Sequence, residues 1–210
     1  VLAMGGDGDG YGIGAGHFVN AGRRNLDMTY IVFNNGVYGL TKGQSSPTLR
    51  RGDKTKSMKE PSIEDNINPI AIAIAAGYTF VARGYAMDVK SMKDILIRAI
   101  QHRGTAIIDV LQPCPVYNDL QTAEFYAGRD LATAIPRVYK LEEEGFDPRV
   151  HDPEDGDEII AKKVAATARS FEWGDRIPIG LFYQVDLPTL GDGFAAHRPD
   201  APTTAMHKQA

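Results

Sequence analysis

Glycine is concentrated at the start of the chain, and this constrains the local fold more than any other feature. Eight of the 22 glycines lie within the first 22 residues, and glycine allows tight turns and close backbone approach. An apolar run at residues 1–4 comes first and is typical of the end of a buried strand. Apolar residues then recur at loose helical spacing, at Ile13, Phe18, Val19 and Ala21. The pattern predicts a turn from strand to helix, where free N–H groups and the helix dipole favour phosphate.

Two simple interpretations of this turn are a tight loop without a ligand and a calcium-binding loop. Asp7 and Asp9 match the first and third ligand positions of a calcium loop. The fifth and twelfth positions would be Tyr11 and Phe18, whose side chains cannot replace the carboxylate ligands. The calcium interpretation therefore fails, whereas the loop without a ligand stays open.

A third interpretation is a dinucleotide-binding fold, because residues 10–15 match the pattern GxGxxA. That motif alone is a weak signal. The next apolar run, residues 30–33, ends in Asn34, whereas a dinucleotide site needs Asp or Glu there to bind the ribose. A nucleotide-binding module that uses the glycine turn without catalysis remains an alternative.

A fourth interpretation, a magnesium diphosphate site, uses more of the residues. Asp7 lies 28 positions before Asn35 (35 − 7), which leaves room for one helix and one strand. In a parallel sheet both residues would lie at the carboxyl ends of neighbouring strands, where α/β proteins bind ligands. Magnesium prefers oxygen ligands and takes few of them from protein. The Asp7 carboxylate, the Asn35 amide oxygen and the Val37 carbonyl would supply three.

The rest of the chain alternates strands and helices, which predicts an α/β fold with a parallel sheet and helices on both faces. Asn68 and Pro69 begin a buried helix that ends at Gly77, and Asp88 begins an amphipathic helix. The Pro-rich end from His197 is expected to be disordered or to wrap around a partner. Strands are expected at residues 30–33, 78–82, 105–111 and 177–183, and a further helix at 159–171.

Charge is distributed unevenly along the chain. Residues 42–59 are basic, whereas the acidic residues 140–158 account for the net charge of −4 and are expected to form an exposed insertion. A basic run is typical of a solvated loop, although it could also attract anionic substrates. Lys42 differs because it follows the Asn-Asn turn directly, and we expect it to be catalytic, near a diphosphate or a substrate carboxylate. The other basic residues of the run are Arg50, Arg51, Lys54, Lys56 and Lys59.

Residues 6–9, the pair Asn34-Asn35 and the block 38–48 together resemble one family, the beta subunits of 2-oxoacid:ferredoxin oxidoreductases. The resemblance implies a thiamine-diphosphate-binding fold. We expect a thiamine diphosphate and magnesium domain at residues 1–135, and a C-terminal extension at 136–210 that packs on this domain or on a partner subunit. The resemblance continues at residues 82–83, 111–115, 117–118 and 173–175. The cofactor contacts that it implies are Gly6, Asp7, Gly8, Asp9, Asn35, Val37, Gly39, Leu40 and Thr41.

Cys114 is the only cysteine, which excludes an internal disulfide and fits a reducing compartment, the cytoplasm. By itself a lone cysteine is typical of a small buried thiol. The resemblance instead implies that Cys114 is one ligand of a 4Fe-4S cluster, whose other cysteines would lie in a segment before Val1. We expect such a segment because the chain begins inside an apparent strand, without an initiator Met.

The resemblance also implies a function: one subunit of an enzyme that oxidatively decarboxylates a 2-oxoacid with CoA to acyl-CoA and CO2. Electrons would pass through the cluster to ferredoxin, and an alpha subunit would supply the glutamate that activates thiamine diphosphate. A non-redox thiamine diphosphate decarboxylase or synthase of the same fold is the alternative, and it would not need Cys114. No apolar run approaches the roughly 20 residues of a membrane helix, and neither a membrane nor a nucleic acid is an expected partner.

Overall fold

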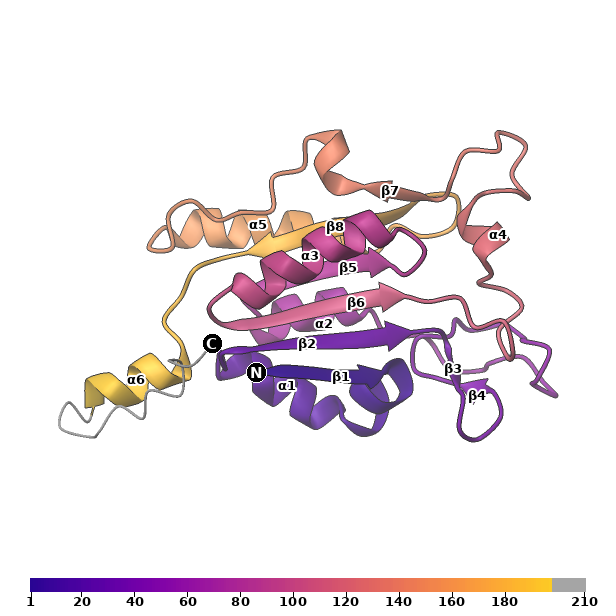
Figure 1. Cartoon of the computed structure of the whole chain (residues 1–210), viewed down its shortest axis with the longest axis horizontal. Helices are drawn as coiled ribbons and strands as arrows, with labels where there is room; N and C mark the ends of the chain where they lie inside the picture. The colour runs from indigo at the N-terminus through magenta and orange to yellow at the C-terminus, as the bar shows by residue number, and fades with distance from the viewer. Residues whose placement is uncertain (198–210) are drawn as a thin grey trace.

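Residues 1–197 are described by the structure, a computed structural model of the chain. Six strands form its central sheet in the order β1-β2-β6-β5-β8-β7 (Figure 1). From β1 to β5 in this order, neighbouring strands are parallel, as predicted. The six strands are β1 (Leu2–Gly6), β2 (Met28–Asn34), β5 (Phe80–Tyr85), β6 (Thr105–Leu111), β7 (Val138–Lys140) and β8 (Ile177–Gln184). A separate short hairpin pairs β3 (Val37–Tyr38) with β4 (Gln44–Ser45).

Helices cover both faces of the sheet, which confirms the predicted α/β fold. On one face α1 (Ala15–Arg23), α2 (Pro69–Ala76) and α5 (Gly156–Ser170) pack beside one another. On the other face α3 (Val89–Gln101) lies in front of β5 and β6 in Figure 1. A buried apolar cluster fills each of the two layers. The other helical elements are η1 (Gly8–Ile13), α4 (Ala123–Tyr126), η2 (Leu141–Glu144) and α6 (Leu190–His197).

The two helices with clear start signals form where the sequence predicts them. The Asn68 side chain accepts a hydrogen bond from Ala71 N at 3.2 Å and so caps α2, which ends at Gly77 with a φ of +90°. The Asp88 carboxylate accepts from Ser91 N at 3.0 Å and caps α3. The predicted apolar face of α3 is only partly buried, because Ile100 remains 59% exposed.

β7 and β8 run in the direction opposite to β5, which the alternation of strands and helices did not predict. The chain leaves β6 at the carboxyl edge of the sheet and passes through α4 into β7 from that same edge (Figure 1). A parallel strand needs a crossover that returns the chain to the opposite edge, and this connection makes none. β8 is buried along nearly its whole length, so it is a central strand. The domain boundary expected at residue 135 stays a prediction, and the sheet continues past it.

The prediction of an exposed insertion at residues 140–158 is wrong in part. Leu141 is fully buried and Val150 is 6% exposed, and both belong to the core on the α2 side. Val150 N donates to the Gln184 carbonyl at 2.9 Å, which fixes the segment along β8. Asp155 caps α5 by accepting from Asp157 N and Glu158 N. The count of charges missed this because Leu141 and Val150 are single apolar residues among many acidic ones.

β1 lies at the edge of the described sheet. Its residues Leu2 and Met4 are 52% and 65% exposed, so the predicted burial of the first strand is wrong within residues 1–197. The tail expected from His197 falls mostly at residues 198–210, outside the described residues. Within the described part of the chain, every helix is too short or too polar to cross a membrane.

His102 ends α3 and is buried, with an exposed fraction of 8%. Its Nε2 atom lies 2.8 Å from Thr79 Oγ1, and its Nδ1 atom lies 3.8 Å from Asp186 Oδ1. Burial lowers the pKa of His102 from the usual 6.5 and outweighs the opposite effect of Asp186 and Asp27. The folded state therefore favours the neutral imidazole.

We expect the contribution of His102 to stability to be lost as the pH falls below about 6.5. Its folded-state pKa is depressed, so the contribution is complete above the unfolded-state pKa and disappears as the pH falls through the folded-state pKa. Thermal unfolding between about pH 7 and pH 5 should show a smaller decrease of the midpoint in His102→Gln than in wild type. The exposed His17 provides the matched control His17→Gln. Equal pH dependence in wild type and His102→Gln would contradict this role.

Candidate functional site

The site lies where β1 and β2 end at the same edge of the sheet. The last pair in their parallel register is Gly6 with Phe33, so Asp7, which follows β1, lies next to Asn34, the last residue of β2. After β1 the chain turns through η1 into α1, which confirms the predicted turn from strand to helix. The carboxyl edge of parallel strands is where α/β folds bind ligands.

Asp7 is a buried carboxylate held by neutral donors. Its exposed fraction is 1%. Its Oδ2 atom accepts from Gly36 N at 3.0 Å, from Thr48 Oγ1 at 2.7 Å, and from the Ser46 hydroxyl. Burial raises the pKa of Asp7, although these hydrogen bonds act in the opposite direction. An ionised Asp7 would therefore be stabilised by a cation.

The turn after β2 carries the other two predicted metal ligands. Asn35 Oδ1 accepts from Val37 N at 3.2 Å, and the Asn35 carbonyl accepts from Asn118 Nδ2 at 2.9 Å. Gly36 N bonds to Asp7, so the structure brings the Asn-Asn turn and Asp7 together. A carboxylate, an amide oxygen and a carbonyl form the hard oxygen set that magnesium prefers. These residues fit that ion by the chemistry of their donors.

Gly5 near the end of β1 and Gly8 in the turn are packed closely against neighbouring side chains. A Cβ added at Gly8 would overlap the Tyr38 ring, and Tyr38 OH donates to the Gly8 carbonyl at 3.2 Å. Asp9 is exposed and directs its carboxylate back over Gly5 and towards the hydroxyl of Tyr30. The structure therefore does not bring the Asp9 side chain to Asp7, although both were predicted cofactor contacts.

A second buried carboxylate, Asp109 on β6, lies behind the site. Its exposed fraction is 0%, and its Oδ1 atom accepts from Asn34 Nδ2 at 2.9 Å and from Tyr11 OH at 3.2 Å. Arg83 Nε donates to its Oδ2 atom at 3.0 Å. Thr48 Oγ1 lies 2.8 Å from Asn34 Oδ1, which links this group to Asp7. Burial raises the pKa of Tyr11 well above its usual value, and Asp109 adds to the effect, so Tyr11 donates its proton.

Sequence reasoning missed the Asp109 group. The available signal was a single carboxylate in the otherwise apolar strand at residues 105–111. A charge buried in a strand needs a partner, but nothing in the sequence around Arg83 identifies it as the partner of Asp109.

The hairpin of β3 and β4 has a base that belongs to the site and an exposed tip. At its base, Ser46 N donates to the Gly36 carbonyl at 3.1 Å. At its tip Leu40 is 98% exposed, and Lys42 is exposed with a φ of +73°. The four predicted residues Gly39, Leu40, Thr41 and Lys42 are thus separated from Asp7 by the length of the hairpin.

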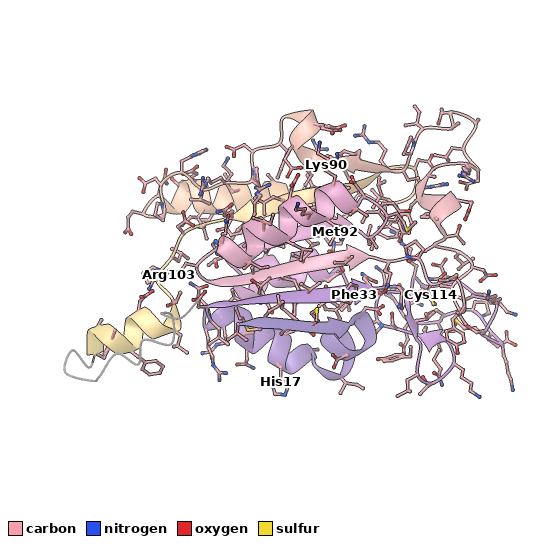
Figure 2. The ribbon with its side chains drawn as sticks, in the orientation of Figure 1. His17, Phe33, Lys90, Met92, Arg103 and Cys114 are labelled. Atoms are coloured by element: carbon pink, nitrogen blue, oxygen red, sulfur yellow. The ribbon has the colours of Figure 1, made fainter. Side chains whose placement is uncertain are left out.

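Cys114 lies at the same edge of the sheet, after β6, and is partly exposed (Figure 2). Its carbonyl accepts from Asn118 N at 3.1 Å, and the Asn118 side chain bonds to the Asn35 carbonyl. Asn118 therefore connects the loop of Cys114 to the Asn-Asn turn. Lys56, grouped by sequence with the loop lysines, donates from Nζ to the Pro115 carbonyl at 3.1 Å. Among residues 1–197 no three His, Cys, Asp or Glu side chains gather as a metal site.

Two family models match the chain. Residues 1–110 match the thiamine pyrophosphate enzyme, C-terminal TPP binding domain. Residues 114–198 match the C terminal of the pyruvate ferredoxin oxidoreductase beta subunit. The first match covers more than half of the 210 residues, so the chain belongs to the thiamine-diphosphate-binding class.

Sequence comparison with known proteins identifies the family within this class. The 2-oxoacid:ferredoxin oxidoreductase subunit beta of Saccharolobus solfataricus is 60% identical over 199 residues, which are 94% of this chain and 62% of that protein. The 2-oxoglutarate oxidoreductase subunit KorB of Mycobacterium tuberculosis is 44% identical over 119 residues, 57% of this chain and 32% of that protein. The chain belongs to the family of 2-oxoacid:ferredoxin oxidoreductase beta subunits.

A solved structure agrees with this assignment. The 2-oxoglutarate:ferredoxin oxidoreductase from Magnetococcus marinus, with 2-oxoglutarate, coenzyme A and succinyl-CoA bound, matches with a TM-score of 0.77 and 33% identity. The match covers 95% of this chain and 62% of that one. The chain thus spans about three fifths of the length of several relatives that it matches.

Proposed function

We propose that this chain is the thiamine-diphosphate-binding part of a cytoplasmic 2-oxoacid:ferredoxin oxidoreductase. With an alpha subunit, the enzyme would convert a 2-oxoacid and CoA to acyl-CoA and CO2 and would reduce ferredoxin. The observation that carries the proposal is the buried Asp7 carboxylate beside the Asn35 turn, at the carboxyl edge of a thiamine-diphosphate-binding fold. The 2-oxoglutarate, coenzyme A and succinyl-CoA bound by the Magnetococcus marinus enzyme support the substrate class.

Three residues would hold magnesium beside the diphosphate. The Asp7 carboxylate provides the charge, and Asn35 Oδ1 and the Val37 carbonyl provide neutral oxygens. The backbone of residues 6–9 and of the hairpin tip at residues 39–41 would contact the cofactor. When bound, thiamine diphosphate supplies the electron sink for decarboxylation of the 2-oxoacid. The alpha subunit would supply the glutamate that activates the cofactor.

Cys114 would bind a 4Fe-4S cluster. Such a cluster takes about four cysteine ligands, and this sequence holds one. The proposal therefore requires three thiolates from outside these 210 residues. Two features support Cys114 as a ligand: it is partly exposed, and Asn118 ties its loop to the Asn35 turn.

Lys42 would bind the carboxylate of the 2-oxoacid, or failing that the cofactor diphosphate. Its exposure at the hairpin tip leaves the ammonium accessible to an anion. The base of the same hairpin contacts Asp7 through Ser46, which fixes the tip relative to the metal ligands.

Asp7→Asn should abolish magnesium-dependent binding of thiamine diphosphate by the assembled enzyme. The amide keeps the shape of the side chain but lacks the charge that holds the cation. Calorimetric titration of the cofactor, with and without magnesium, measures this. Asp9→Asn is the matched control, because the Asp9 carboxylate points away from Asp7 and only its backbone would contact the cofactor. Unchanged affinity in Asp7→Asn would remove Asp7 as a ligand.

Cys114→Ala in the assembled enzyme should deplete iron and stop ferredoxin reduction while thiamine diphosphate stays bound. The two cofactors would use different side chains, so only one is lost. Iron analysis, absorbance in the visible range and cofactor content measure the three quantities. Wild-type iron content and ferredoxin reduction in Cys114→Ala would make Cys114 a packing residue.

Lys42→Ala should raise the Michaelis constant for the 2-oxoacid about tenfold to a hundredfold, the loss expected for one contact to an ionised group. Cofactor affinity should stay unchanged, whereas a fall in that affinity would assign Lys42 to the diphosphate instead. Steady-state kinetics and cofactor titration provide both values. Lys54→Ala, at an exposed loop lysine, is the matched control. Changes below about twofold, as for a solvated surface charge, would exclude both roles of Lys42.

A further inference from the structure

A cavity of about 400 Å³ opens at the carboxyl edge of the sheet, between the start of α2 and the end of α5. Asn34 and Thr48 separate it from Asp7, and none of the three proposed magnesium ligands lines it. Cys114 and Lys42 do not line it either. The proposed reaction therefore gives this cavity no role. Its lining includes Arg50, Arg83, Asn68, Ile72, Phe171 and Trp173.

Arg83 lines the cavity and carries a hydrogen-bond donor without a partner among residues 1–197. The residue is 3% exposed, and its Nε atom is paired with Asp109. Its Nη1 atom is buried and has no hydrogen-bond partner among residues 1–197. A guanidinium has five N–H donors and no acceptor, and a buried donor without a partner is costly. The guanidinium lies over the Phe182 ring, with Cζ 5.4 Å from the ring centroid, and Nη1 itself is covered. An anion in the cavity would satisfy this donor once the guanidinium turns towards it.

Arg50 provides a second guanidinium on the same cavity. It lies over the Trp173 ring, with Cζ 5.0 Å from the ring centroid. Burial lowers the pKa of Arg50, and the opposite effect of Asp53 is smaller. The acids that face the two arginines are thus Asp109, paired with Arg83, and Asp53 near Arg50. Each arginine therefore has an acidic partner, but the Nη1 atom of Arg83 has no hydrogen-bond partner among residues 1–197.

The other walls restrict the class of ligand. Asn68 Nδ2 donates to Ser170 Oγ at 2.8 Å, so these two polar groups satisfy each other. Ile72, Phe171 and Trp173 present apolar surface. Arginine recognises carboxylates through paired N–H donors, and small-molecule sites combine apolar walls with a few such groups.

We propose that this cavity binds a small organic carboxylate. The carboxylate would accept from the guanidinium groups of Arg83 and Arg50, and the apolar body would lie against Ile72 and Trp173. The site is separate from the one proposed for the 2-oxoacid. Hydrogen bonds from Arg83 to Asp109, from Asn34 to Asp109 and from Thr48 to Asn34 connect it to the proposed magnesium site.

Calorimetric titration of the assembled enzyme with benzoate, and separately with phosphate, tests the proposal. Benzoate should bind once per copy of this chain. Arg50→Met should weaken binding about tenfold to a hundredfold, as expected for one contact to an ionised group. Arg51→Met is the matched control, because Arg51 is exposed, pairs with Asp65 and does not line the cavity. Its affinity should equal that of wild type.

Two further variants keep the test decisive. Arg83→Met should abolish binding, but it leaves Asp109 buried without its cation and can impair folding. Ala71→Leu fills the cavity from α2 without removing a charge, and it should also abolish binding. No benzoate binding by wild type, or equal affinity in wild type, Arg50→Met and Ala71→Leu, would overturn the proposal. Binding of phosphate without binding of benzoate would overturn the assignment to carboxylates.

Discussion

The buried carboxylate of Asp109 is the interaction on which the arrangement of the site depends. It lies on β6 in the middle of the sheet and accepts hydrogen bonds from three other segments, through Tyr11 of η1, Asn34 of β2 and Arg83 of β5. Removal of one partner from a buried ion pair costs about 3–5 kcal/mol, because the remaining charge is left uncompensated. These bonds therefore hold the ends of β2, β5 and β6 in one relative position. They also fix Asn34: its Nδ2 atom must face Asp109, so its Oδ1 atom faces Thr48.

Asp7 and Asp109 are both buried, yet their surroundings differ in charge. Arg83 compensates Asp109, whereas Asp7 is bonded to one backbone N–H and two hydroxyls, all of which are neutral. The Thr48 hydroxyl lies near both Asp7 and Asn34 but has one proton, so it can donate to only one of them at a time. The missing positive charge beside Asp7 is the physical reason to expect a cation there. In the proposed function magnesium supplies that charge, and the neutral oxygens of the Asn35 turn complete its protein ligands.

Local signals in the sequence predicted the parts of the fold that local interactions determine. Asn68 and Gly77 delimit α2, and the apolar run at residues 105–111 is β6, because caps and strand patterns act over a few residues. The direction of β8 and the burial of Leu141 depend on pairing between distant segments, which no local pattern records. For the site, motif spacing correctly brought Asp7 and the Asn35 turn together. It could not reveal the pairing of Arg83 with Asp109, because a lone acid in an apolar strand does not identify its partner.

The hairpin of β3 and β4 has a base that is bonded to Asp7 and a tip that is exposed within residues 1–197. At its base, the hydroxyls of Ser46 and Thr48 donate hydrogen bonds to Asp7. The hairpin is therefore held at its base by contacts within residues 1–197. Its tip carries Leu40 at 98% exposure and Lys42 in a left-handed conformation that costs a residue other than glycine roughly 1–2 kcal/mol. Within residues 1–197, neither the exposed Leu40 side chain nor the strained Lys42 backbone is stabilised by burial. A surface that meets the cofactor and an alpha subunit would account for both, since the ligands of the tip would then come from outside while Asp7 remains anchored from within.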